Sequence, residues 1–119
     1  MNQNPNNKTY NLEERALQFA QRVNNYVRDL PKDLPNIENG KQLVRSAGSV
    51  GANYIEANES LSKKDFVMRT KISKKEAKES RYWLILTQPR AASQREKEIL
   101  VQEATELMKI LGSILEKSK

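Results

Sequence analysis

The spacing of apolar residues constrains this chain most, because four segments repeat such residues every three or four positions. The first segment carries Leu12, Ala16, Phe19, Val23 and Val27 at this spacing, and similar stripes follow in the other three. This period gives an α-helix one apolar face, and no stretch has the alternation typical of a β-strand. We therefore predict four helices, at about residues 12–30, 39–59, 63–87 and 94–117.

Four helices of this length with short connections favour an all-α fold, an antiparallel up-down-up-down four-helix bundle. The chain has 119 residues, which suits a single core. We expect residues 1–10 to form a flexible polar N-terminal tail and residues 11–119 to form the bundle domain.

Residues that can cap a helix precede three of the segments. Asn11, Ser62 and Ser93 each carry a side-chain oxygen that can accept a hydrogen bond from the first free amides of a helix. Glu96 stands three residues after Ser93, which completes a capping-box pattern. The two prolines within residues 31–39 are expected to end the first helix and to form a loop before the second.

Small residues dominate the middle of the second and third segments. Gly48 and Gly51 each cost a helix about 1 kcal/mol relative to alanine, so we expect a neighbouring helix to approach closely there. Their spacing does not match a phosphate-binding glycine loop, and no strand precedes them. The inner stripe of the third segment is also small in its middle, and its members are Phe66, Thr70, Ser73, Ala77, Ser80 and Leu84.

The fourth segment has a broader apolar arc than one core needs. Exposed apolar surface of this kind is usually covered by another molecule, and soluble proteins most often cover it by forming homo-oligomers. We predict a homo-oligomer, with Tyr82, Trp83 and Ile110 as candidate interface residues.

The chain contains neither Cys nor His. Their absence excludes disulfides, thiolate metal sites and nucleophile–histidine pairs, so we predict a protein that is not an enzyme and needs no cofactor or metal. The longest apolar run, residues 83–86, is far shorter than the roughly 20 residues that span a bilayer. With its polar start, the sequence predicts a cytoplasmic protein with no membrane role.

Positive charge gathers in the third segment. Residues 63–81 hold eight basic and three acidic residues, so they carry +5 of the total net charge of +6. Such a stretch can neutralise phosphates and release counterions, which favours binding of RNA or DNA. Solubility alone is the competing interpretation. The candidate nucleic-acid-binding residues are Lys63, Lys64, Lys71, Lys74, Lys75 and Lys78.

Four glutamates stand in pairs at helical spacing. Glu56 with Glu59 and Glu76 with Glu79 could in principle hold two metal ions in a carboxylate-bridged enzyme, but such bundles rely on a Glu-x-x-His motif, which is absent. We favour ion pairs of Glu56 and Glu79 with Arg45, Arg69 or Arg81, because buried charges persist when paired. The predicted structural polar network consists of Arg45, Ser49, Asn53, Glu56, Arg69 and Glu79.

Three stretches resemble the four-helix bundle family first named for reading frames within intervening sequences of bacterial 23S ribosomal RNA genes. They are LQFA at residues 17–20, LVRSAGSVGANYIEA at 43–57 and KEAKESRYWL at 75–84. The resemblance implies a homopentameric assembly of four-helix protomers. A related branch, the accessory variability proteins of diversity-generating retroelements, is similar in fold and uses a basic outer surface to bind reverse transcriptase and nucleic acid. Arg45, Ser49, Asn53, Glu56, Glu79 and Trp83 stand where the family pattern expects them.

Three functions remain open from the sequence. The first is an oligomeric nucleic-acid or ribonucleoprotein-associated binding module. The second is a structural module that binds another protein and uses its charge for solubility. The third, more remote, is the carboxylate-bridged metal enzyme.

Overall fold

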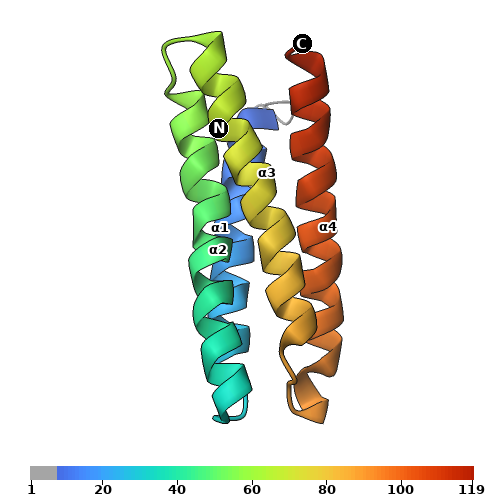
Figure 1. Cartoon of the computed structure of the whole chain (residues 1–119). Helices are drawn as coiled ribbons and strands as arrows, with labels where there is room; N and C mark the ends of the chain where they lie inside the picture. Colours follow the sequence, from blue (N-terminus) through green and yellow to red (C-terminus); the bar gives the residue numbers. More distant parts are fainter. Residues whose placement is uncertain (1–7) are drawn as a thin grey trace.

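The computed structural model describes the backbone of residues 8–119 and the side chains from Leu12 onward. Figure 1 shows the long helices side by side, joined at alternate ends of the molecule. The all-α class with four long helices is confirmed, and no strand occurs within these residues. The elements are α1 (Lys8–Arg28), α2 (Leu34–Asn58), α3 (Lys63–Leu86), a short 3-10 helix η1 (Ala91–Ser93) and α4 (Gln94–Lys117).

Helix α1 begins earlier than predicted. It starts at Lys8, so Asn11 lies inside the helix, and the predicted cap at Asn11 is wrong. The predicted tail, residues 1–10, lies outside the described residues except for residues 8–10, which belong to α1.

Helix α2 also begins earlier, at Leu34 rather than near residue 39. The Oδ1 atom of Asp33 accepts a hydrogen bond of 2.9 Å from the Asn36 amide, which makes Asp33 the cap. Pro35 lies in the first turn, where a missing N–H costs nothing and a fixed φ suits the helix. Pro35 therefore helps to begin α2, and the loop before α2 is shorter than predicted.

The two serines predicted as caps behave differently. Ser62 has extended backbone angles, and its hydroxyl accepts from the Asp65 amide at 3.1 Å, as predicted. Ser93 ends η1 with ψ near 5°, and its side chain makes no capping bond. The predicted capping box is wrong because Ser93 lacks the extended backbone that aims a cap, and because Glu96 pairs with Arg22 of α1.

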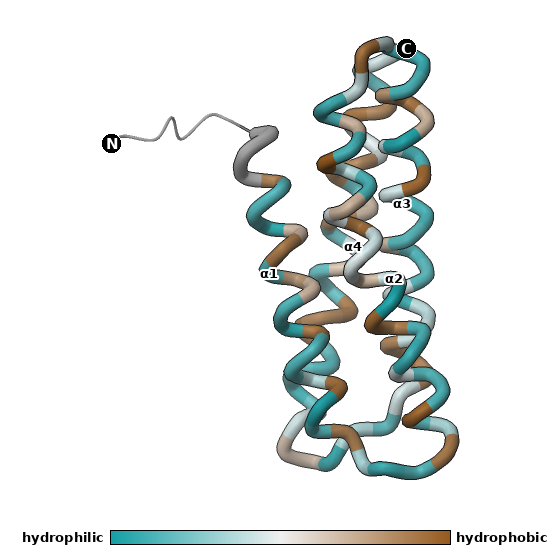
Figure 2. Tube along the Cα trace, turned by 90° about the vertical axis from the view of Figure 1, so that its left-hand side faces the viewer, coloured by the Kyte–Doolittle hydropathy of each residue, from teal (hydrophilic) through white to brown (hydrophobic). Residues whose placement is uncertain are grey.

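The core runs the length of the bundle. Figure 2 shows apolar and polar residues alternating along each helix, as expected where one face is buried. Tyr26 lies in this core, where its hydroxyl and that of Thr87 are 2.7 Å apart. Burial raises the pKa of Tyr26 above its ordinary value, and the Thr87 hydrogen bond partly opposes this. The largest fully buried side chains include Phe19, Leu43, Leu84, Leu100, Leu107 and Leu111.

Helices α2 and α3 pack most closely, through small residues. The Ser73 hydroxyl donates to the Val50 carbonyl at 2.7 Å, and the hydroxyls of Ser46 and Ser80 are 2.9 Å apart. Because these bonds satisfy the buried hydroxyls, the small polar stripe can lie in the core. The predicted close contact between the two small-residue segments is confirmed.

The glycines of α2 face different surroundings. A β-carbon on Gly51 would lie 3.3 Å from Cβ of Ala16, so Gly51 allows α1 to approach α2. Gly48 is exposed, and none of the described residues lies within 4 Å of the position of its missing β-carbon. The expected neighbour therefore exists for Gly51, whereas Gly48 has none among the residues that the structure describes.

The broad apolar arc of α4 is used within the chain. Its flanking residues Val101, Met108, Ile110 and Ile114 are partly buried against the core. The large apolar side chains that remain exposed in the described residues belong instead to α1, α2, α3 and the connection after α2. The apolar surface that α4 leaves to solvent is therefore smaller than predicted, because these side chains are partly buried.

Candidate nucleic-acid interface

The rotation of α3 places the predicted lysines on its outer side. Burial of Thr70, Ser73 and Ala77 fixes which face of α3 points inward. Residues on the opposite face then point to solvent, because side chains repeat every 3.6 positions. Of the six candidates, five are exposed and one is partly buried; the exposed ones are Lys63, Lys64, Lys71, Lys75 and Lys78. We call these six lysines the basic face.

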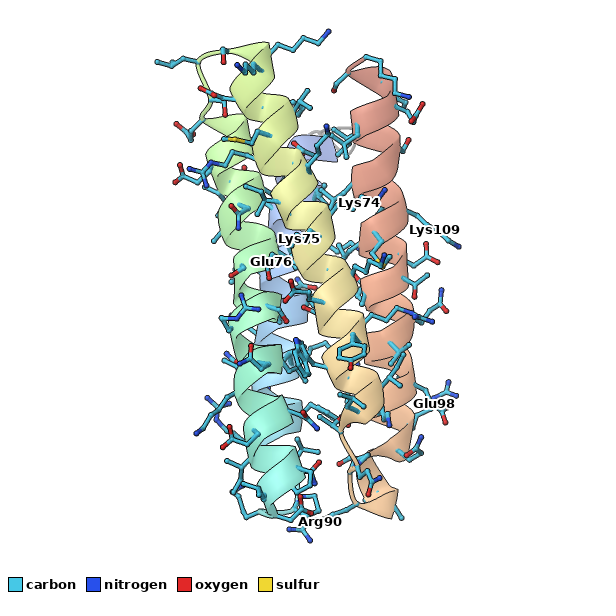
Figure 3. The ribbon with its side chains drawn as sticks, in the orientation of Figure 1. Lys74, Lys75, Glu76, Arg90, Glu98 and Lys109 are labelled. Atoms are coloured by element: carbon cyan, nitrogen blue, oxygen red, sulfur yellow. The ribbon has the colours of Figure 1, made fainter. Side chains whose placement is uncertain are left out.

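Lys74, the partly buried member, lies toward α4. Figure 3 labels it between α3 and α4, with Lys109 on the outer side of α4. The Nζ atom of Lys74 is 3.3 Å from the position that a β-carbon on Gly112 would take. Gly112 therefore leaves room for the Lys74 side chain, which extends the basic face toward α4.

Acidic residues do not neutralise the basic face. Within residues 12–119, no carboxylate lies within 4.0 Å of any of its six ammonium groups. The two glutamates in the middle of α3 point toward α2, where Arg45 approaches Glu76 at 3.4 Å and Glu79 at 2.8 Å. The positive charge of the basic face is thus uncompensated within the described part of the chain.

A polar network joins α2 to α3 beside the basic face. Besides its two ion pairs, Arg45 accepts at its carbonyl from the Ser49 hydroxyl at 2.9 Å. Asn53 donates to the Ser49 carbonyl at 2.9 Å and accepts from Arg69 at 3.2 Å. The structure therefore brings together five of the six predicted residues. Glu56 is exposed and outside these contacts.

The four glutamates of the metal hypothesis are not brought together. Glu56 and Glu59 are exposed, while Glu76 and Glu79 bond to Arg45. Among the residues with described side chains, no group of three or more Asp, Glu, His or Cys is arranged to hold a metal ion. The predicted preference for ion pairs holds for Glu79 with Arg45, but not for Glu56.

The three candidate interface residues lie in different surroundings. Tyr82 is 57% exposed, whereas Trp83 and Ile110 are partly buried against the core. The rings of Tyr82 and Trp83 meet edge to face, with centroids 5.0 Å apart. The buried Nε1 of Trp83 has no hydrogen-bond partner among the described residues. Tyr82 alone of the three presents a large apolar surface to solvent.

An apolar surface that the sequence did not predict lies along α1 and α2. Leu17 is 50% exposed, Ile55 46% and Val44 40%. A groove of about 430 Å³ continues it at the turn between the helices, lined mostly by apolar residues that include Val27 and Ile37. The apolar stripe of each helix suggested burial, and only the tertiary arrangement shows which flank stays open.

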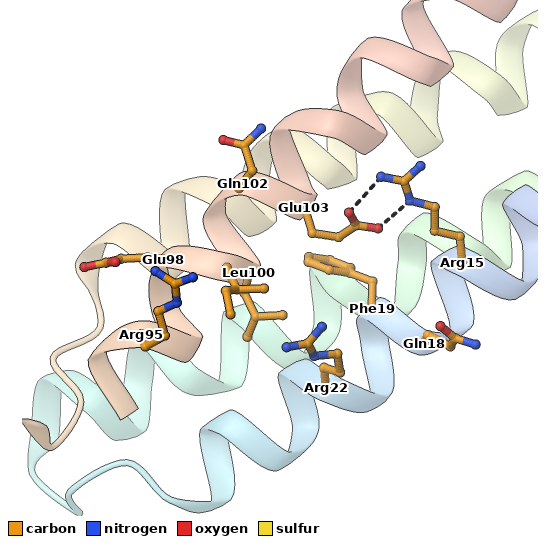
Figure 4. Close-up of a pocket in the computed structure, with 10 residues that line it drawn as sticks. Arg15, Gln18, Phe19, Arg22, Arg95, Glu98, Leu100, Gln102 and Glu103 are labelled. Carbon is orange, nitrogen blue, oxygen red and sulfur yellow. Dashed lines mark hydrogen bonds and ion pairs between the residues drawn. The ribbon is translucent and has the colours of Figure 1, made fainter. Parts of the chain in front are cut away.

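A second cleft, of about 610 Å³, lies between α1 and α4. Figure 4 shows Arg15 bound to Glu103 across it, with Phe19 beneath. The two hydrogen bonds of this pair measure 2.6 and 2.8 Å, and they raise the pKa of Arg15 above its ordinary value. Arg22 binds Glu96 in the same two-pronged way, at 3.0 and 2.6 Å, which likewise raises its pKa. These charges are matched, so the cleft offers no net attraction to an anion.

None of the described helices is both long and apolar enough to cross a bilayer. None of the curated proteins matches the chain. A solved structure of a protein with unknown function from the S23 ribosomal protein family, from Bacteroides thetaiotaomicron, is similar. It is 32% identical, with a TM-score of 0.78, and the match covers 92% of this chain and 98% of that one. The family of 23S rRNA-intervening sequence proteins matches residues 8–113. The chain therefore belongs to the 23S rRNA-intervening sequence protein family, as its resemblance indicated.

Proposed function

We propose that this chain is a cytoplasmic, non-enzymatic, self-associating module that binds nucleic acid or a ribonucleoprotein through the basic face of its antiparallel up-down-up-down bundle. The observation that carries the proposal is the uncompensated charge of α3. Six lysines lie within 16 positions of one helix, and no acidic side chain in the described residues pairs with them. A surface kept only for solubility has no need to separate its charges in this way.

The polar network between α2 and α3 supports this proposal. Arg45 holds Glu76 and Glu79 on the side of α3 away from the lysines, at 3.4 and 2.8 Å. Without Arg45, these carboxylates would be free to turn toward lysines one turn away on α3. The network thus keeps Glu76 and Glu79 from screening the basic face.

Self-association is supported by the apolar surface along α1 and α2. Successive helices are neighbours, so this surface and the basic face occupy opposite flanks of the bundle. Copies joined through the α1–α2 flank leave every basic face open, whether they number five, as the resemblance implies, or fewer. Several basic faces in one particle raise avidity for a long polyanion without any new contact.

The experiment is a salt titration of binding to mixed-sequence RNA and DNA, for the unchanged chain and a triple variant with Lys71, Lys75 and Lys78 changed to Glu. We expect binding at about 50 mM salt that weakens steeply as salt rises. The triple variant should lose at least about tenfold in affinity at 100 mM salt, and its log–log salt slope should fall by about two to three.

A matched control carries the same change in net charge elsewhere. Lys109, Lys117 and Lys119 are exposed and lie outside both the basic face and the apolar surface along α1 and α2, so changing them to Glu should alter affinity far less. Equal losses in both triple variants would show that total charge, not the basic face, drives binding. Failure of the unchanged chain to bind at about 50 mM salt would remove the proposal and leave a protein-binding module as the function.

A further inference from the structure

We propose that Tyr82 provides a stacking platform at the end of the basic face, so that this face selects single-stranded nucleic acid over a duplex. The inference rests on the proposed function and goes beyond it by naming the form of the ligand. It starts from the one large aromatic ring that the described part of the bundle leaves mostly open to solvent.

Tyr82 is in line with the lysines. Lys71, Lys75, Lys78 and Tyr82 follow one another at spacings of four, three and four positions, which places them along one face of a helix. At about 1.5 Å per residue, Lys71 and Tyr82 are roughly 16 Å apart along the axis, the length of a few stacked nucleotides. A strand whose phosphates follow the lysines therefore reaches the ring.

The ring of Tyr82 is supported by the neighbouring Trp83. Its edge-to-face contact with Trp83 has centroids 5.0 Å apart and an interplanar angle of 74°, and Trp83 itself packs against the core. The end of α3 is also tied down, because Lys97 of α4 donates to the carbonyls of Ile85 at 3.1 Å and Thr87 at 2.7 Å. A ring held in this way loses little freedom when a base stacks on it, so stacking adds affinity.

A duplex gains nothing from such a ring. Its bases are already stacked in the helix interior, and its phosphates contact only the lysines. A single strand offers unpaired bases, and stacking on an exposed aromatic side chain is tolerant of sequence. The combination of lysines and one exposed ring therefore favours single strands without a preferred sequence.

The test measures affinities for three ligands of one sequence: a single-stranded 12-mer RNA, its duplex, and a 12-mer with the same phosphates but abasic sugars. We expect the unchanged chain to bind the single strand at least about fivefold more tightly than the other two. Tyr82→Ala should weaken single-strand binding about five- to tenfold and leave duplex and abasic binding unchanged. Tyr82→Phe keeps the ring and should retain the preference.

Leu86→Ala is the matched control. Leu86 lies one turn beyond Tyr82 and is 41% exposed, but it has no ring, so its loss should leave the single-strand preference intact. Equal affinity for intact and abasic strands would overturn the inference. If the triple variant with Lys71, Lys75 and Lys78 changed to Glu still lost binding, the proposed function would remain. A change in the mass of the particle in Tyr82→Ala alone would also overturn it, since the ring would then belong to a subunit contact.

Discussion

Ser62 and Ser93 both stand immediately before a helix, but only Ser62 bonds to a free amide of that helix. We expect Ser62→Ala to lower the free energy of unfolding by about 1 kcal/mol, because the Asp65 amide loses its acceptor. Ser93→Ala should change it by less than about 0.5 kcal/mol. Urea unfolding of both variants, followed by circular dichroism, measures the difference, and equal losses would contradict the two cap geometries.

Single-residue patterns predict such caps only in part. A Ser with Glu three positions later matches a capping box in letters, but the bond also needs an extended backbone at the Ser. At Ser93 the preceding 3-10 turn removes that backbone, and a partner 74 positions away takes Glu96. Asp33 with Pro35 shows the reverse case, because a proline predicted to end one helix belongs to the first turn of the next.

Gly48 and Gly51 of α2 allow a prediction about how helices approach. Gly48→Ala should stabilise the chain by about 0.5–1 kcal/mol, because alanine favours the helix and none of the described residues lies within 4 Å of the new β-carbon. Gly51→Ala should gain less or destabilise, since its β-carbon would lie 3.3 Å from that of Ala16 on α1.

Thermal or urea unfolding of the two variants, at equal protein concentration, gives the comparison. A loss of stability in Gly48→Ala accompanied by a lower particle mass would contradict this expectation, and it would place Gly48 where two copies of the chain meet.

At the scale of elements, the helical period predicted the buried face of a helix better than it predicted the contacts between helices. The buried stripe of α3 is recovered almost residue by residue, because the period alone determines which positions share a face. The neighbour opposite each glycine depends on how the four helices are arranged, and the period contains no such information. The same holds for the apolar arc of α4, whose flanking residues are partly buried against the core.

At the scale of the whole molecule, one part of the candidate site could be predicted from the sequence and another part could not. The lysines of the basic face were predictable, since they lie opposite a stripe that the sequence defines. The partners of the glutamates were not predictable, because Glu76 and Glu79 bind an arginine 31 and 34 positions away, whereas Glu56 contacts none of the predicted arginines. The open apolar flank along α1 and α2 was missed for the same reason.

The edge between α1 and α4 is the least packed side of the bundle, and it allows a prediction about the whole molecule. Two ion pairs, Arg15–Glu103 and Arg22–Glu96, cross this edge. Each is partly exposed, so we assign it no more than about 0.5 kcal/mol. Replacing both glutamates with Gln should therefore speed hydrogen exchange of α1 about two- to fivefold and leave the centres of α2 and α3 unchanged.

The matched control replaces Glu38 and Glu116, whose ion pairs with Lys41 and Lys119 lie within single helical turns, and it should not alter exchange in α1. Hydrogen exchange followed by mass spectrometry separates the helices. Helix α1 should also exchange fastest of the four in the unchanged chain, because it packs closely on α2 alone. Uniform acceleration of all four helices in the Glu96 and Glu103 variant would mean that the bundle opens as one unit, and that these ion pairs hold the whole molecule rather than its α1 edge.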